Sequence, residues 1–264
     1  MKNILVVLMM SLALSGGRDA KPGGVKALHE AFADAKTKPV RVLFVGNSYT
    51  SANNLPKMLT ALAASAKPPV RIQGGRFTKG GYTFGRHAKD DTCRKMISDG
   101  KWDVVVLQEQ SQMPFVRPKL MHADARKLHA DVQKAGAKTV FFMTWARAHQ
   151  GEMIEKIAKA YNGIAAELGA VAAPVGRAWQ KALAARPKLK LHKGDGSHPN
   201  AHGTYLAACV FYATFTGRDP RGLAGGTPGE INAADRRFLQ RIAWETAPKA
   251  GRKATTQPAT APGK

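Results

Sequence analysis

The stretch Val40-Arg41-Val42-Leu43-Phe44-Val45-Gly46-Asn47-Ser48-Tyr49-Thr50 decides how this chain folds. Its first half is mostly apolar and rich in β-branched valine, which favours a buried β-strand. Gly46 and Asn47 tolerate backbone angles that most residues avoid, so the chain can turn sharply after the strand. Apolar residues then recur at helical spacing, which predicts a helix over 54–67. Ser48 therefore lies at a strand-to-helix junction.

Ser48 has two interpretations at this junction. In a parallel sheet, ligands bind at the carboxyl ends of the strands, so a serine there can be a nucleophile. The amides of the following helix could then stabilise an oxyanion. The alternative is an ordinary helix N-cap, a role that Ser48 would share with Thr50, Ser51 and Asn53. This stretch alone leaves both interpretations open.

Strands and helices alternate along the rest of the chain. Apolar runs predict four further strands, at 70–73, 102–107, 138–145 and 171–175. Helical periodicity predicts helices over 86–98, 119–135, 152–168, 177–185, 200–216 and 232–245. This alternation predicts an α/β fold with a mainly parallel, roughly five-stranded sheet that is covered by helices on both faces, a three-layer α/β/α sandwich.

Composition suits a single α/β domain better than a nucleic-acid binder. The chain has 264 residues, of which 44% are hydrophobic, enough for one α/β domain with a sizeable core. Its 41 basic and 18 acidic residues give a formal charge of +23. The basic residues are scattered, so they form a solvated surface or attract acidic polymers. Without a basic run or a recognisable nucleic-acid module, nucleic-acid binding is disfavoured.

The two ends of the chain differ from its centre. Residues 1–15 have a basic start, an apolar run and small residues at the end, which predicts a cleaved signal peptide and a secreted or periplasmic protein. No later apolar segment is long enough to cross a membrane. We expect an N-terminal leader at 16–37, the folded domain at 38–248 and a disordered basic tail at 249–264.

The second stretch that carries chemistry is Leu191-His192-Lys193-Gly194-Asp195-Gly196-Ser197-His198-Pro199-Asn200. A tight turn can bring Asp195 against one imidazole nitrogen of His198, which leaves the other nitrogen to take a proton from a serine. Pro199 favours a helix start directly after the histidine. The alternative is an Asp-Gly turn with an exposed histidine that has no function.

A metal site is a third interpretation of the same stretch. His192, Asp195, His198 and His202 lie close in sequence, and the last two histidines have the i, i+4 spacing of paired helical ligands. However, Pro199 places His198 at or before the helix start, and no glutamate lies between the two histidines. We therefore expect neither a metal nor another cofactor.

Four short motifs follow one another in a characteristic order: Gly46-Asn47-Ser48, Gly80-Gly81, Gln108-Glu109-Gln110-Ser111 and Asp195-x-x-His198. Over about residues 38–215 this order resembles the SGNH (GDSL-like) hydrolase superfamily. The resemblance implies a flavodoxin-like sheet and an ester hydrolase that needs no cofactor.

The resemblance also implies roles for individual residues. Ser48 matches the nucleophile, His198 the general base and Asp195 its orienting partner. The oxyanion hole would consist of the Ser48 amide, the Gly81 amide and the side chain of Gln110. Gly80 is the alternative to Gly81, and Asn47 stands where the family often has aspartate.

The third motif departs from the family. Gln108-Glu109-Gln110-Ser111 replaces the usual Gly-x-Asn-Asp, so glutamine stands where the oxyanion asparagine is expected. Glu109 is interpreted as a surface charge. This departure leaves open a degenerate member of the family that binds a glycan but is catalytically weak.

Together these observations predict a secreted serine esterase that forms an acyl-enzyme. Family and export together imply a small-acyl, acetyl-type ester on a carbohydrate as the substrate, with a lipid esterase as the alternative. Two cysteines, Cys93 and Cys209, are too few for a disulfide framework and leave a single bridge open.

Overall fold

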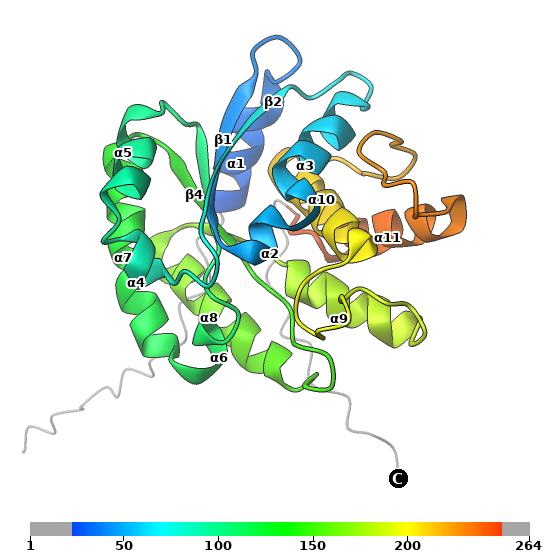
Figure 1. Cartoon of the computed structure of the whole chain (residues 1–264). Coiled ribbons are helices and arrows are strands. Elements are labelled where there is room, and N and C mark those ends of the chain that lie inside the picture. The colour runs from blue at the N-terminus through cyan, green and yellow to red at the C-terminus, as the bar shows by residue number, and fades with distance from the viewer. Residues whose placement is uncertain (1–22, 250–264) are drawn as a thin grey trace, which may run out of the picture.

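Five parallel strands form the centre of the molecule, between two layers of helices (Figure 1). The computed structural model describes residues 23–249. The strands lie in the order β2-β1-β3-β4-β5. They are β1 (Val40–Gly46), β2 (Ile72–Thr78), β3 (Val104–Leu107), β4 (Lys138–Phe142) and β5 (Val171–Ala173). The predicted fold class is therefore confirmed.

The helices divide between the two faces of the sheet. One layer contains α1 (Gly23–Ala33), α3 (Leu55–Ala64), α9 (Val175–Ala185), α10 (Ala201–Thr216) and α11 (Ala233–Thr246). The other contains α4 (Phe84–His87), α5 (Asp91–Asp99), α6 (Met113–Val116), α7 (Pro118–Lys134) and α8 (Met153–Leu168). The short helix α2 (Ser48–Ser51) and a 3-10 turn, η1 (Ala52–Asn54), connect β1 to α3.

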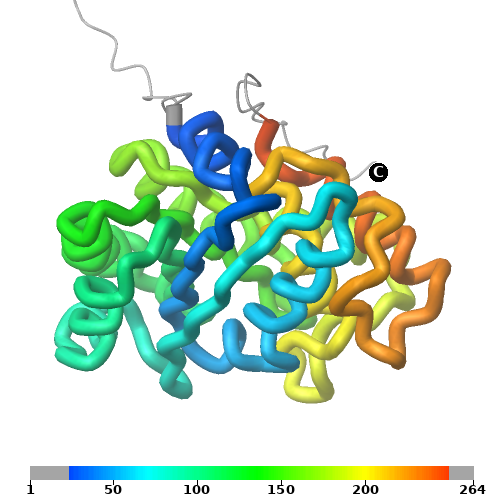
Figure 2. Tube along the Cα trace, turned by 90° about the horizontal axis from the view of Figure 1, so that it is seen from above, coloured from blue at the N-terminus to red at the C-terminus, as the bar shows by residue number. Residues whose placement is uncertain are grey.

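The side chains of β1 show why both faces of the sheet are covered. Val42 and Phe44 pack into the core on the α10 face, whereas Leu43 and Val45 pack into the core on the α7 face. Successive strand residues point to opposite faces, so an apolar run without polar alternation buries both of them. Figure 2 shows β1 and β2 side by side, in blue and cyan.

The second strand is longer than predicted and lies two residues further along the chain. It continues through Gly74 and Gly75, beyond the predicted end at residue 73, and pairs with β1 from Ile72 to Thr78. Gly75 serves packing here, because a Cβ atom at this position would lie 2.3 Å from the Trp102 ring. The neighbouring strand and the indole thus determine the conformation of this segment.

The helix predicted at 86–98 is two helices. The chain leaves α4 after His87, and α5 begins at Asp91. Asp90 caps the second helix, because its carboxylate accepts a hydrogen bond from the Cys93 amide at 3.1 Å. An N-cap aspartate is a start signal that the continuous helical interpretation overlooked.

Part of the segment expected to be a leader packs onto the domain. Leu28 and Phe32 of α1 are buried, and the Phe32 ring stacks on Phe215 of α10 with the ring centres 5.0 Å apart. The periodicity of this short helix is too weak to show which surface it covers. The predicted signal peptide and nearly all of the predicted tail lie outside the described residues. Within 23–249, no helix is both long and apolar enough to span a bilayer.

The two cysteines lie on opposite sides of the sheet. Cys93 belongs to the core on the α7 face and Cys209 to the core on the α10 face, and both are free thiols. The bridge left open by the sequence is therefore absent from this structure.

Candidate active site

The turn after β1 presents the Ser48 side chain without using it as a helix cap. The N-cap of α2 is Asn47, whose side-chain oxygen accepts a hydrogen bond from the Tyr49 amide at 3.1 Å. Ser48 is the first residue of the helix, and its hydroxyl bonds to His198 instead. The N-cap interpretation of Ser48 is therefore wrong, because its neighbour fills that position.

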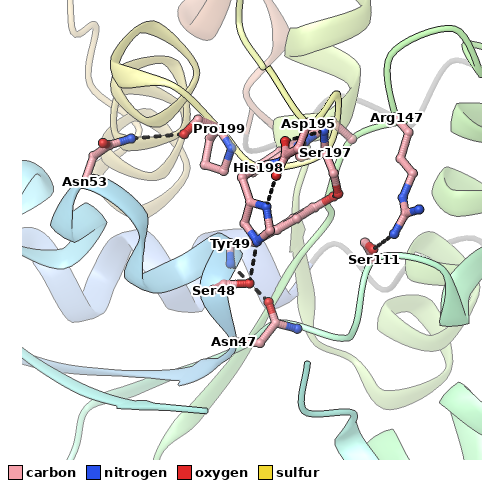
Figure 3. Close-up of polar contacts among 11 residues, drawn as sticks. Asn47, Ser48, Tyr49, Asn53, Ser111, Arg147, Asp195, Ser197, His198 and Pro199 are labelled. Carbon is pink, nitrogen blue, oxygen red and sulfur yellow. Dashed lines mark hydrogen bonds and ion pairs between the residues drawn. The ribbon is translucent and has the colours of Figure 1, made fainter. Parts of the chain in front are cut away.

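Ser48, His198 and Asp195 form one hydrogen-bonded chain (Figure 3). Ser48 Oγ lies 2.8 Å from His198 Nε2, and His198 Nδ1 lies 2.5 Å from Asp195 Oδ2. A carboxylate is an acceptor, so Nδ1 carries the proton and Nε2 presents its lone pair to the serine. This arrangement suits removal of the hydroxyl proton.

Asp195 is held ionised by its surroundings, although it is partly exposed. The His198 ring, followed by the backbone amides of Ser197 and His198, keeps the pKa of this carboxyl well below its usual range. Both amides donate to Oδ1 at 2.9 Å, while Oδ2 bonds to the ring. The carboxylate therefore fixes both the local turn and the orientation of the imidazole.

A stack of three aromatic side chains supports the Asp195–His198 loop. The Tyr49 ring stacks on Trp145 with centres 4.6 Å apart, and Trp145 stacks on Trp179 at 3.9 Å. The Tyr49 hydroxyl lies 2.6 Å from Ser197 Oγ, and Trp145 Nε1 donates to the Ser197 carbonyl at 3.0 Å. Tyr49, next to Ser48, and Trp145, in the segment after β4, thus position the histidine loop.

The glycine pair after β2 contains one residue that requires glycine. Gly81 has a φ of +67°, in the left-handed region, and a Cβ atom there would meet no neighbour. Asn47 Nδ2 donates to the Tyr82 carbonyl at 3.1 Å, which brings this loop beside the Ser48 turn. Between the two glycines, the backbone therefore favours Gly81 over Gly80 as the specialised position.

Gln110 is partly buried on the loop that follows β3, at the same edge of the sheet. Its side-chain oxygen accepts a hydrogen bond from the Gln112 amide at 2.8 Å. Within the described residues no protein acceptor bonds to its amide nitrogen. The oxygen thus fixes the side chain to its own loop while the NH₂ group stays available for a ligand.

Glu109 is buried, so its interpretation as a surface charge is wrong. Its Oε1 accepts hydrogen bonds from the Phe84 amide at 3.0 Å and the Gln110 amide at 2.6 Å. Its Oε2 is buried and has no hydrogen-bond partner among residues 23–249. Burial raises the pKa of this carboxyl to about 8. One carboxyl group therefore joins the loop after Gly81 to the loop that carries Gln110.

Comparisons with known proteins identify the architecture. The sequence matches no protein-family profile and no curated protein. Among solved structures, a protein from Slackia heliotrinireducens described as a candidate SGNH hydrolase has 27% identity and a TM-score of 0.59, covering 67% of this chain and 99% of its own. The chain has the fold of the SGNH hydrolases. This confirms the predicted family resemblance and the predicted class, an ester-bond hydrolase.

Two further solved structures share this fold. A DUF4886 family protein from Bacteroides uniformis has 20% identity and a TM-score of 0.68, covering 79% of this chain and 94% of its own. An acetylxylan esterase from Geobacillus stearothermophilus has 16% identity and a TM-score of 0.55, covering 69% of this chain and 96% of its own.

Sequence reasoning missed Gln108, which supports the turn that carries Ser48. Its side-chain oxygen accepts hydrogen bonds from the Asn47 amide and the Thr50 hydroxyl, both at 2.9 Å. A Cβ atom on Gly46 would lie 2.6 Å from that oxygen. Gly46 is therefore needed for the close approach of Gln108. A polar residue directly after an apolar strand was the available signal.

The histidines considered as metal ligands have separate partners. His192 Nε2 lies 3.0 Å from the Ala146 carbonyl, His202 lies 3.4 Å from Asp235, and His198 faces Ser48. Among residues 23–249, no group of three histidine, cysteine or acidic side chains is placed to hold a metal ion.

Proposed function

We propose that this protein is a serine esterase of the SGNH type in which Ser48 is the nucleophile, His198 the general base and Asp195 its orienting carboxylate. The observation that carries the proposal is the 2.8 Å contact between Ser48 Oγ and the unprotonated nitrogen of His198. Nucleophile, base and orienting group within hydrogen-bond reach are what acyl transfer by serine requires.

The reaction follows from this geometry in two halves. His198 Nε2 takes the hydroxyl proton as Ser48 Oγ bonds to the ester carbonyl carbon. The tetrahedral intermediate collapses, the carbon–oxygen bond to the alcohol breaks, and His198 returns its proton to the departing alcohol. Water then attacks the acyl-enzyme with the same base, which releases the carboxylic acid and restores the serine.

The developing negative oxygen needs donors that are already in place. We assign this role to the amides of Ser48 and Gly81 and to the side chain of Gln110. The assignment is supported by the left-handed backbone of Gly81 and by the unpaired side-chain nitrogen of Gln110. Glutamine is one methylene longer than asparagine, and the bond from its oxygen to Gln112 holds the longer side chain back.

The substrate is proposed to be a small-acyl ester, such as an acetyl ester, on a carbohydrate outside the cell. Two observations support this: a structure of the same fold is an acetylxylan esterase, and residues 1–15 have the pattern of a signal peptide. The formal charge of +23 would favour acidic glycans. Turnover of acetyl and octanoyl nitrophenyl esters tests the choice, because faster octanoyl turnover would indicate a lipid esterase.

Labelling with a fluorophosphonate tests the mechanism directly. Peptide mass spectrometry should find the adduct on Ser48, and Ser48→Ala should lose both labelling and turnover. Ser51→Ala, on the same short helix, is the matched control and should label normally. An adduct on Ser111 or Ser197, or the absence of an adduct on active protein, would refute the assignment.

A further inference from the structure

A cavity of about 880 Å³ lies beside the proposed active site. Its walls come from the segment after β4 (145–149), the start of α8, one side of α9 and the segment 187–196. Neither Ser48 nor His198 lines it. Its volume is within the range of roughly 300–1,000 Å³ that is typical of small-molecule sites. It is therefore a separate space that shares one wall with the histidine loop.

The inner surface of the cavity is apolar. Three elements contribute aliphatic side chains to it: Ile154 from α8, Leu183 from α9, and Leu189 and Leu191 from the following segment. Leu183 and Leu189 are only partly buried, so they leave apolar surface in contact with solvent. Covering that surface with a hydrocarbon group would be favourable.

The cavity's lining carries positive charge without any acidic group. Its ionisable members are Arg147, Lys190, Lys193, His149 and His192, and no aspartate or glutamate lines it. Within residues 23–249, neither the arginine nor either lysine takes part in an ion pair. The lining is therefore complementary to an anion.

Arg147 gives the clearest indication of where an anion would bind. Its Nη2 donates to Ser111 Oγ at 3.3 Å (Figure 3), and among residues 23–249 its Nη1 has no hydrogen-bond partner. A guanidinium has donors in a fixed fork that matches a carboxylate. This side chain therefore has donors left for an anion in the cavity that it lines.

We propose that this cavity binds an alkyl carboxylate of medium chain length, with the chain against the leucines and the carboxylate at Arg147 and Lys190. The apolar lining would bind the alkyl chain, and the cations that have no ion-pair partner would bind the carboxylate. Because Ser48 and His198 do not line the cavity, binding does not require an intact nucleophile. The proposal is therefore independent of the esterase assignment.

Isothermal titration of the full chain with octanoate tests the proposal. We expect one octanoate per chain, with acetate and octanol each binding at least tenfold more weakly. Ser48→Ala should bind octanoate with unchanged affinity. No octanoate binding at millimolar concentration, or binding that is lost in Ser48→Ala, would overturn it.

Variants of the lining residues distinguish binding of the carboxylate from binding of the alkyl chain. The double variant Arg147→Gln with Lys190→Gln should weaken octanoate binding at least tenfold and leave octanol binding unchanged. Leu183→Asp should weaken both ligands. Lys188→Gln, an exposed neighbour outside the lining, is the matched control and should bind normally. Equal octanoate affinity in the double variant and this control would also overturn the proposal. Melting temperatures establish that each variant is folded.

Discussion

The Ser48 turn and the histidine loop meet at one hydrogen bond, but they are held in different ways. The turn at 46–50 is buried except for the partly buried Ser48, and Gln108 fixes it through Asn47 and Thr50. The histidine loop is partly exposed, and the Asp195 carboxylate fixes it through its own amides. Changes in the buried turn should therefore affect stability and activity together, whereas changes in the exposed loop should affect activity alone.

The largest loss of activity is expected for a change in the exposed histidine loop. His198→Ala should lower kcat by about 10³ or more, because the serine loses its base, while the melting temperature stays close to that of the wild type. His202→Ala, on the neighbouring helix, is the control in steady-state assays of ester hydrolysis. Loss of activity with a chelator and its restoration by zinc would contradict the serine mechanism.

The next largest loss of activity is expected for a change at Gln110. Gln110→Ala should lower kcat by roughly 10²–10³ and leave KM nearly unchanged, because an oxyanion contact strengthens in the transition state. The variant should still be labelled slowly at Ser48. Gln112→Ala is the matched control on the same loop. Near-normal kcat in Gln110→Ala would show that another group completes the oxyanion hole.

Gly46→Ala tests the buried turn. The new methyl group would meet the Gln108 oxygen and the Thr50 hydroxyl, both 2.6 Å from its position, so we expect a loss of about 1–3 kcal/mol in unfolding free energy. Displacement of Ser48 should also lower kcat, by about 10²-fold for a shift near 1 Å. Denaturant unfolding and steady-state kinetics measure both quantities. Gly151→Ala, where a methyl group meets nothing, is the control, and equal stability of the two variants would refute this account.

The smallest effect is expected in the pH dependence of stability. Burial raises the pKa of Glu109 from 4.5 to about 8, so the folded state keeps a proton that the unfolded state releases. The contribution of Glu109 to stability therefore falls from about pH 4.5 to about pH 8 and is constant above. Glu109→Gln should flatten this fall, because a side-chain amide does not titrate. The variant should still fold, since the amide oxygen can accept both backbone hydrogen bonds.

Melting temperatures between pH 5 and pH 8 measure this difference. Glu152→Gln, at an exposed position, is the control and should keep the pH profile of the wild type. An identical profile in Glu109→Gln would show that Glu109 titrates in its ordinary range.

Local patterns were sufficient for the architecture and for three positions of the proposed site. The apolar run of β1 and the helical periodicity after it predicted the junction at Ser48, and the spacing of Asp195 and His198 predicted their contact. These features depend on neighbours a few residues apart, where backbone preference and side-chain periodicity dominate. Their catalytic roles stay predictions until the labelling and the variants are measured.

Other features depend on contacts between distant segments, and the tertiary structure alone shows them. Burial makes Glu109, an expected surface charge, a bridge between two loops, and it makes Gln108 the support of the Ser48 turn. The core takes up α1 from a segment that was expected to be a leader, and the fold gathers Arg147 and Lys190 around an apolar cavity. A side chain's environment is set by segments far away along the chain, so its burial and charge balance emerge when the elements pack.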